Sequence, residues 1–406
     1  MELAENSQVK MHFFWRDPQG KSSSVRRVYI EIGGVVNHHS TDPESLKRVP
    51  GTDVWHWSME IEDDWRGSYC LIPVEEEYLP PSFSEEAEAR RLQQRAWWIS
   101  LMPLAIADPL NPLRPFRNSR GFSRSAAQTP NAPVLPVWQS WDCHEPFEEP
   151  AAPQRLTWQS ALLGNQRRVW LWACEEGNKP EQRPLIILLD GQNWAEGQPI
   201  FSALAAETAA GRLPPACWLL IDSINGQHRE AELPCNPHFW QAVSEELIPL
   251  AARQQPFSQL ADRTLVAGQS YGGLAALYAG LHFPWRFGRI LTQSGSFWWP
   301  NLNFIYDFAG RERHQPGLLL RQLARDELPN GRLRIFQEAG SRERNIAFVN
   351  QQLAPALEAA GHQLHFRLFS GGHDGLCWRD GLIDGCRWLL ADLLPSSSLS
   401  SGDVDD

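Results

Sequence analysis

Two different patterns of hydrophobic and polar residues divide the chain. In the first part, short runs rich in β-branched and aromatic residues are separated by turns that contain glycine or proline, which is typical of β-strands. Strands are expected at residues 9–15, 25–32, 54–61 and 68–73, and a charged helix at residues 85–98. Strands at this spacing predict a small β-sandwich.

A different alternation follows residue 153. Buried strands are expected at residues 168–173, 185–189, 217–221, 264–267, 289–292, 332–336 and 364–368. Helices are expected between them, at residues 200–209, 239–253, 273–282, 317–325, 345–360 and 380–394. This alternation predicts a mostly parallel, doubly wound sheet with helices on both faces. We therefore expect a sandwich domain (1–128), a proline-rich linker (129–153), an α/β domain (154–395) and a disordered tail (396–406).

Composition narrows the function classes for this chain of 406 residues. The net charge of −11 argues against nonspecific binding to nucleic acid, because no overall positive field attracts phosphates. The seven cysteines are scattered and never spaced C-x-x-C, so we expect neither a disulfide framework nor a metal site. No apolar run approaches the roughly 18 residues of a membrane span, and no secretion signal is visible. We therefore expect a cytoplasmic protein without membrane contact.

A nucleophile motif follows the fourth strand of the α/β part. Residues 268–272 read Gly-Gln-Ser-Tyr-Gly and match G-x-S-x-G. The motif has the expected context, since an apolar strand precedes it and a helix of small residues follows it. Such a turn presents its serine at the carboxyl edge of the sheet, with helical N–H groups beside it. Ser270 is therefore the predicted nucleophile.

The base and the acid should follow in the order serine, acid, histidine, as in α/β-hydrolases. His373 fits the position of the base, because it comes after two glycines on the loop behind the last strand. Two carboxylates follow the preceding strand. We favour Glu343, which lies on the loop and can reach inward, over Glu338, which is nearer the strand. Asp374 is a neighbour of His373 in sequence and is badly placed to orient the same ring.

The remaining candidate residues surround this predicted site. One oxyanion donor should be the N–H of Tyr271, and a second that of Gly191 or Gln192, on the loop after an early strand. Aromatic and cationic side chains share the loops at the carboxyl ends of the strands, and would suit a flat, aromatic, anionic ligand. These candidate substrate-binding residues are Trp194, Arg229, Trp298, Trp299, Trp378 and Arg379. Simple packing of the tryptophans and solvation of the arginines is the alternative for each residue.

The chain resembles the bacterial enterochelin (enterobactin) esterases, which hydrolyse ferric siderophores, over nearly its whole length. The resemblance rests on short motifs at residues 14–18, 51–55, 65–69, 106–112, 188–191, 232–236, 267–270, 293–296, 338–340, 371–374 and 377–379, and on Arg229. It implies an immunoglobulin-like domain before an α/β-hydrolase domain, and hydrolysis of the trilactone of enterobactin by Ser270, His373 and a third residue, best matched by Glu343. The chain departs from the family in having Arg344-Asn345 where a proline usually follows that acid.

The resemblance also implies the ligands. The expected partner is ferric enterobactin or a related catecholate siderophore, and no cofactor is expected, because Fe³⁺ enters as part of the substrate. Three alternatives stay open: an esterase for feruloyl or thioester compounds, a noncatalytic siderophore-binding protein, and a carbohydrate-binding role for the first domain. The preference among glucosylated, linear and iron-free forms, and the oligomeric state, are not determined by the sequence.

Overall fold

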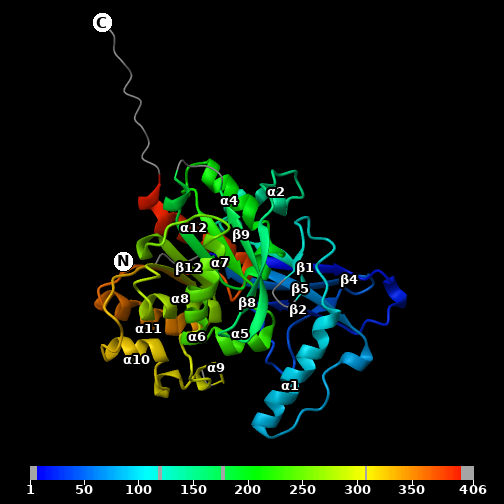
Figure 1. Ribbon diagram of the computed structural model, residues 1–406. Coiled ribbons are helices and arrows are strands. Elements are labelled where there is room, and N and C mark those ends of the chain that lie inside the picture. Colours follow the sequence, from blue (N-terminus) through cyan, green and yellow to red (C-terminus); the bar gives the residue numbers. More distant parts are fainter. Residues whose placement is uncertain (1–6, 118–120, 175–178, 307–308, 395–406) are drawn as a thin grey trace.

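The computed structural model describes residues 7–117, 121–174, 179–306 and 309–394 and consists of a β-rich N-terminal domain beside a larger α/β domain (Figure 1). The elements of the N-terminal part are β1 (Gln8–Arg16), β2 (Arg27–Ile32), β3 (Ser45–Arg48), β4 (Val54–Glu62), β5 (Arg66–Val74), α1 (Ala87–Leu101), β6 (Phe116–Arg117), β7 (Ser123–Gln128) and α2 (Gln139–Asp142). The strands pair in the order β1-β4-β3-β2-β5-β7-β6. Short β3 pairs with β2 through its first half and with β4 through its second, so it joins two groups of strands.

The N-terminal domain has its own hydrophobic core on each side of β2 and β5. Alternate residues of β2, such as Val28 and Ile30, face a core shared with β1 and β4. Tyr29, between them, faces the opposite side and packs with Trp97 and Trp98 of α1. This alternation is the two-residue period of a strand, and it explains why nearly every residue of β5 is buried.

The α/β domain is built on a sheet of eight strands. They are β8 (Gln154–Ser160), β9 (Asn165–Ala173), β10 (Leu185–Leu188), β11 (Cys217–Ile221), β12 (Thr264–Gln269), β13 (Arg289–Gln293), β14 (Arg334–Gly340) and β15 (Gln363–Phe369). The spatial order is β15-β14-β13-β12-β10-β11-β9-β8, and the strands from β11 to β15 are parallel. The central strands β10 to β13 are buried throughout, so they read as continuous apolar runs instead of alternating ones.

Helices cover both faces of this sheet, as expected for a doubly wound fold. The helices are α3 (Gly191–Ala195), α4 (Ile200–Ala209), α5 (Gly226–Glu232), α6 (Pro237–Ala242), α7 (Ile248–Ala252), α8 (Tyr271–His282), α9 (Asn303–Tyr306), α10 (Leu318–Ala324), α11 (Asn345–Ala359) and α12 (Gly375–Leu390). Helices α6, α7, α8 and α11 share one core, which Leu185 and Ile187 of β10 enter. Helices α4 and α12 share the other, which Ile186 and Leu188 enter.

One expectation about an element boundary was wrong. Helix α12 begins at Gly375, five residues before the expected start, because the Asp374 side chain accepts a hydrogen bond from Leu376 N and caps the helix. Residues 129–153, expected as a linker or wrap between the domains, pack in part on the α/β domain, since Trp138 is fully buried in its core. The expected tail, residues 396–406, lies outside the described residues. In the described part of the chain, no helix combines the length and apolar character needed to cross a bilayer.

Candidate active site

The candidate catalytic residues follow the carboxyl ends of four neighbouring parallel strands. Ser270 comes directly after β12, Ser294 after β13, Glu343 after β14, and His373 after β15. Because these strand ends lie at one edge of the sheet, residues that are up to about a hundred positions apart in sequence gather there.

The turn that carries Ser270 is tight and strained. Ser270 has φ 59° and ψ −119°, in a region that non-glycine residues rarely adopt. Its N–H donates to Gln293 O at 3.0 Å, which holds the turn against the neighbouring strand. A Cβ atom on Gly268 would lie 2.3 Å from Gly272 O, so a side chain there would collide with the backbone across the turn. This geometry is that of a nucleophile elbow.

His373 and Glu343 form a direct pair. His373 Nδ1 lies 2.7 Å from Glu343 Oε2. The Glu343 side chain is only 1% exposed, and its other oxygen accepts from Ser294 Oγ at 2.5 Å and from Gly340 N at 2.7 Å. Three donors therefore fix this carboxylate. Because the carboxylate occupies Nδ1, the ring offers Nε2 for proton exchange, and the ring remains 41% exposed.

A second contact fixes the imidazole from another direction. The Trp378 ring stands edge-on to the His373 ring, with centroids 4.7 Å apart, and Trp378 Nε1 donates to Ser294 Oγ at 2.9 Å. Ser294 therefore links the tryptophan to the Glu343 carboxylate. Residue-by-residue reasoning missed Ser294. The signal that the sequence offers for it is a serine directly after a predicted central strand. The structure shows that this serine is buried and has a positive φ.

Ser270 is not hydrogen-bonded to His373 in the described structure. Its Oγ pairs with Ser296 Oγ at 3.5 Å, and Ser296 N donates to Ser270 O at 3.1 Å. The hydroxyl thus rests on the loop after β13, at the same edge as the His373–Glu343 pair. Long or absent catalytic hydrogen bonds are common before substrate binds.

Glu338, the alternative acid, belongs to a different network. It is completely buried on β14, where its two oxygens accept from Gln293 Nε2 at 2.6 Å and from Arg367 Nε at 2.8 Å. Burial raises the pKa of this carboxyl, while Arg367 opposes the rise. Of the two carboxylates, Glu343 is the one that is hydrogen-bonded to the His373 ring.

The loop expected to supply oxyanion donors lies beside the elbow. Tyr271 is the first residue of α8, so its N–H points out of the N-terminal end of that helix. A Cβ atom on Gly272 would lie 3.4 Å from Asp190 Oδ2, which places Asp190, and with it Gly191 and Gln192, next to the elbow. Asp190 itself has φ 53° and begins the short helix α3.

Arg229 holds this loop. Its Nε and Nη2 donate to the two Asp190 oxygens, both at 2.8 Å, and Nη2 also reaches Gln269 O. The guanidinium lies over the Tyr271 ring, 5.6 Å from its centroid. Arg229 is therefore part of the site as a support for Asp190, and a contact with substrate stays a prediction.

Three of the predicted substrate-binding residues are buried, and that prediction was wrong for them. The Arg379 side chain is 1% exposed, because it is paired with Asp142 of α2 and lies over the Trp138 ring. Trp194 and Trp298 are each only 4% exposed. Trp299 and Trp378 are half-buried, and the Trp299 ring lies 6.0 Å from that of Tyr271; for these two tryptophans a contact with substrate stays a prediction.

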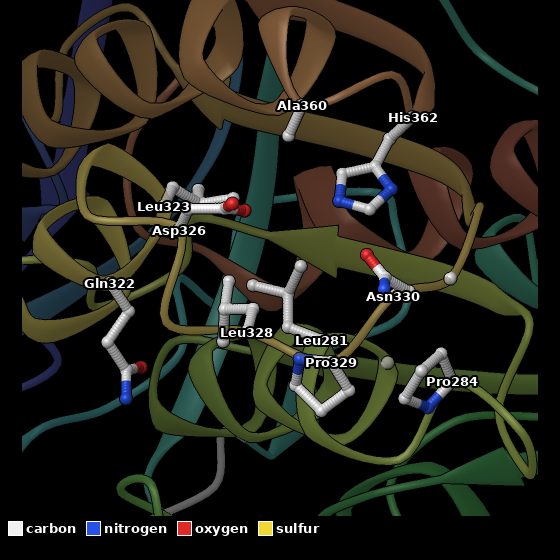
Figure 2. Close-up of a pocket in the computed structure, with 12 residues that line it drawn as sticks. Leu281, Pro284, Gln322, Leu323, Asp326, Leu328, Pro329, Asn330, Ala360 and His362 are labelled. Atoms are coloured by element: carbon white, nitrogen blue, oxygen red, sulfur yellow. The ribbon is translucent and has the colours of Figure 1, made fainter.

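Two further features of the described residues bear on where chemistry can occur. Among the described residues, no group of three or more histidine, cysteine, aspartate or glutamate side chains is placed to hold a metal ion. A pocket of about 100 Å³ is lined by the C-terminal ends of α8 and α10 and by Asn330, Ala360 and His362. Figure 2 shows the side chains that surround it. The pocket lies at the amino-terminal edge of the sheet, because these helices lead into the starts of β13 to β15.

A serine at a strand-to-helix elbow, beside a buried carboxylate–histidine pair on an α/β sheet, defines a hydrolase of the α/β-hydrolase-like fold. Comparisons with known proteins give the family. The sequence profile described as "Enterochelin esterase, N-terminal" matches residues 10–138, and the one described as "Putative esterase" matches residues 160–389. The chain belongs to the iron(III) enterobactin esterase family, and it is an esterase with an N-terminal β-rich domain.

Its relatives are similar over most of their length. The iron(III) enterobactin esterase of Dickeya dadantii (strain 3937) is 58% identical, covering 96% of this chain and 89% of that protein. That of Escherichia coli (strain K12) is 46% identical over 92% and 89%. The crystal structure of ferric enterobactin esterase from Salmonella typhimurium matches with a TM-score of 0.85 and 44% identity, covering 96% of this chain and 95% of that one. The Shigella flexneri enterobactin esterase crystallised in the presence of enterobactin matches with a TM-score of 0.82 and 42% identity, covering 97% and 96%.

Proposed function

We propose that this chain hydrolyses the lactone bonds of ferric enterobactin, with Ser270 as nucleophile, His373 as base and Glu343 as the acid that orients it. The observation that carries the assignment is the 2.7 Å contact between His373 Nδ1 and a Glu343 carboxylate fixed by two further donors. The names of the relatives give the substrate class.

The reaction begins with a rotation of the Ser270 hydroxyl from Ser296 toward His373 Nε2. His373 takes the proton as Ser270 Oγ attacks a lactone carbonyl, and the buried Glu343 carboxylate stabilises the imidazolium that forms. The N–H of Tyr271 and one from Gly191 or Gln192 stabilise the oxyanion. His373 returns the proton to the leaving serine hydroxyl of the substrate. A water then hydrolyses the acyl-enzyme with His373 again as base.

The substrate supplies its own iron. Three catecholates joined by one ring form a preorganised ligand, and opening the ring removes that preorganisation, which loosens the metal. We expect no cofactor and no catalytic metal, and we expect the reaction in the cytoplasm. Trp299 and Trp378 are the half-buried aromatic surfaces available to the catechol rings.

The N-terminal domain is proposed to be an immunoglobulin-like sandwich. The support for this inference is that β3 pairs with both β2 and β4, which lets the sheet fold over the core formed by side chains of β1, β2, β4 and β5.

Chromatography of products from ferric and iron-free enterobactin tests the function. Wild type should release dihydroxybenzoyl-serine units, and Ser270→Ala should release none while still binding the siderophore. A fluorophosphonate probe should label wild type and fail to label Ser270→Ala. If wild type hydrolyses feruloyl or thioester substrates but not enterobactin, its substrate belongs to another class. Failure of the probe to label wild type would indicate a binding protein.

A further inference from the structure

The loop that carries His373 is bonded to the N-terminal domain on both sides of the histidine. Before it, Ser370 O accepts from Arg66 N of β5 at 3.1 Å. After it, Asp374 Oδ2 accepts from Ser68 N at 2.7 Å and from Ser68 Oγ at 2.6 Å. Both Ser68 and Asp374 are buried. Two positions of one strand, 66 and 68, therefore hold both ends of a five-residue loop.

Backbone packing presses the same loop against a second segment of the N-terminal domain. A Cβ atom on Gly372 would lie 2.3 Å from Gly33 O, and one on Gly34 would lie 3.1 Å from the Gly372 Cα. No side chain fits between these segments. The residue directly before His373 thus lies in van der Waals contact with the loop after β2.

Ser68 is itself held by a buried cation. Arg124 Nε donates to Ser68 Oγ at 2.6 Å, and Arg124 Nη2 donates to Ser68 O at 2.8 Å. Arg124 also forms an ion pair with Glu31. The Ser68 hydroxyl therefore accepts from Arg124 and donates to Asp374, so its dipole is aligned between a positive and a negative charge, which strengthens both bonds.

Asp374 joins this chain of contacts to the catalytic domain. Its other oxygen caps α12 by accepting from Leu376 N at 2.8 Å. We propose that Ser68, through Asp374, is a positioning residue for the catalytic base, so that the N-terminal domain sets the orientation of His373. This inference rests on the proposed function, because it presupposes that His373 is the base.

Two nearly isosteric variants test the proposal from opposite sides in the full-length chain. Ser68→Ala removes the hydroxyl, whereas Asp374→Asn keeps a helix-capping oxygen but places an amide where two Ser68 donors need an acceptor. Tyr69→Phe is the matched control. It removes a hydroxyl from the next residue of β5 whose two hydrogen bonds stay within the N-terminal domain: Tyr69 Oη donates to Asp108 at 2.6 Å and accepts from Asn111 Nδ2 at 3.2 Å.

A misplaced base lowers turnover more than binding. We expect each of the two variants to lower kcat for ferric enterobactin roughly ten- to hundredfold, with KM changed by less than about twofold. The double variant should be no worse than the poorer single one, because both remove the same contact. Tyr69→Phe should lower the melting temperature about as much as the two test variants do, but should leave kcat within about twofold of wild type.

Two outcomes would overturn the proposal. One is a Ser68→Ala enzyme with the kcat of wild type. The other is a nonspecific loss of kcat. Such a loss would be proportional to the loss of melting temperature in both Ser68→Ala and Tyr69→Phe, or would add fully when Ser68→Ala and Asp374→Asn are combined. The proposed function is tested separately, by the activity and probe labelling of wild type and by the activity of Ser270→Ala, none of which depends on Ser68 or Asp374.

Discussion

Replacing Glu343 with glutamine tests the acid–base pair most directly. The carboxylate Oε1 accepts from Ser294 Oγ and Gly340 N, and Oε2 faces His373 Nδ1. A glutamine has one oxygen, and keeping it toward the two donors preserves two buried hydrogen bonds. Its NH₂ group then faces His373, so Nδ1 must accept and the proton moves to Nε2.

That tautomer cannot take a proton from Ser270. In a serine protease, the corresponding substitution lowers kcat about 10⁴-fold through the same tautomer change. For Glu343→Gln we expect a fall of roughly 10³- to 10⁴-fold in kcat, which corresponds to about 4–5.5 kcal/mol of transition-state stabilisation. The opposite orientation of the amide would place NH₂ against two donors, which costs about 1–3 kcal/mol for each group left unpaired.

The assay is steady-state hydrolysis of ferric enterobactin, followed by chromatography of the products. Glu338→Gln is the control, because it also neutralises a buried carboxyl, which lies within β14 and is hydrogen-bonded to Gln293 and Arg367 instead of His373. Melting temperatures of both variants show that the folds are intact. A Glu343→Gln enzyme within tenfold of wild type, or one matched by Glu338→Gln, would refute the assignment of the acid.

Three further predictions concern the elbow, the aromatic support and the domain interface. Gly268→Ala should destabilise the chain by about 1–3 kcal/mol in urea denaturation and abolish hydrolysis, because its Cβ would lie 2.3 Å from Gly272 O. Gly226→Ala, with open space around it, is the control and should change little. Equal stabilities of the two variants would contradict the role of the tight turn. Trp378→Phe keeps a ring beside His373 but removes the donor to Ser294 Oγ, so kcat should fall roughly tenfold with little change in KM; unchanged turnover would show that this hydrogen bond is dispensable. Asp380 of α12 forms an ion pair with Arg66 of β5 across the domain interface. Burial raises the pKa of Asp380 from 3.8 to about 6, so its contribution to stability is fully present below pH 3.8 and is lost as the pH rises through 6. The unfolding free energy of wild type minus that of Asp380→Asn should therefore fall by about 3 kcal/mol between about pH 4 and pH 7, and a constant difference would contradict the raised pKa.

The sequence predicted those parts of the fold that depend on local pattern. Strands β10 to β13 are continuous apolar runs, and α4 and α11 show clear helical periodicity, so their positions were close to those found. Strand β8, which reads QRLTWQS, was missed because its few apolar residues give no distinct signal. The start of α12 was misplaced because Asp374 was weighed as a candidate acid and not as a helix cap.

The parts of the site that depend on contacts between residues far apart in the sequence could not be predicted. The preference for Glu343 over Glu338 followed from its place on a loop, and the geometry agrees. Arg379 was assigned to substrate because it follows His373 closely, yet its partner Asp142 lies 237 residues earlier, and no local pattern reveals which face of α12 meets it. The contact of Ser68 with Asp374 spans 306 residues and was invisible for the same reason.

The buried Trp138 has a consequence for how a bulky ligand gains access. Trp138 belongs to the segment that joins the two domains, its indole lies in the α/β core that α4 and α12 share, and the Arg379 guanidinium lies over it. Withdrawing such a side chain from a core costs about 3–5 kcal/mol, so the connection between the domains does not serve as a loose hinge. A siderophore must then gain access through the movement of individual loops, while the two domains stay fixed relative to each other.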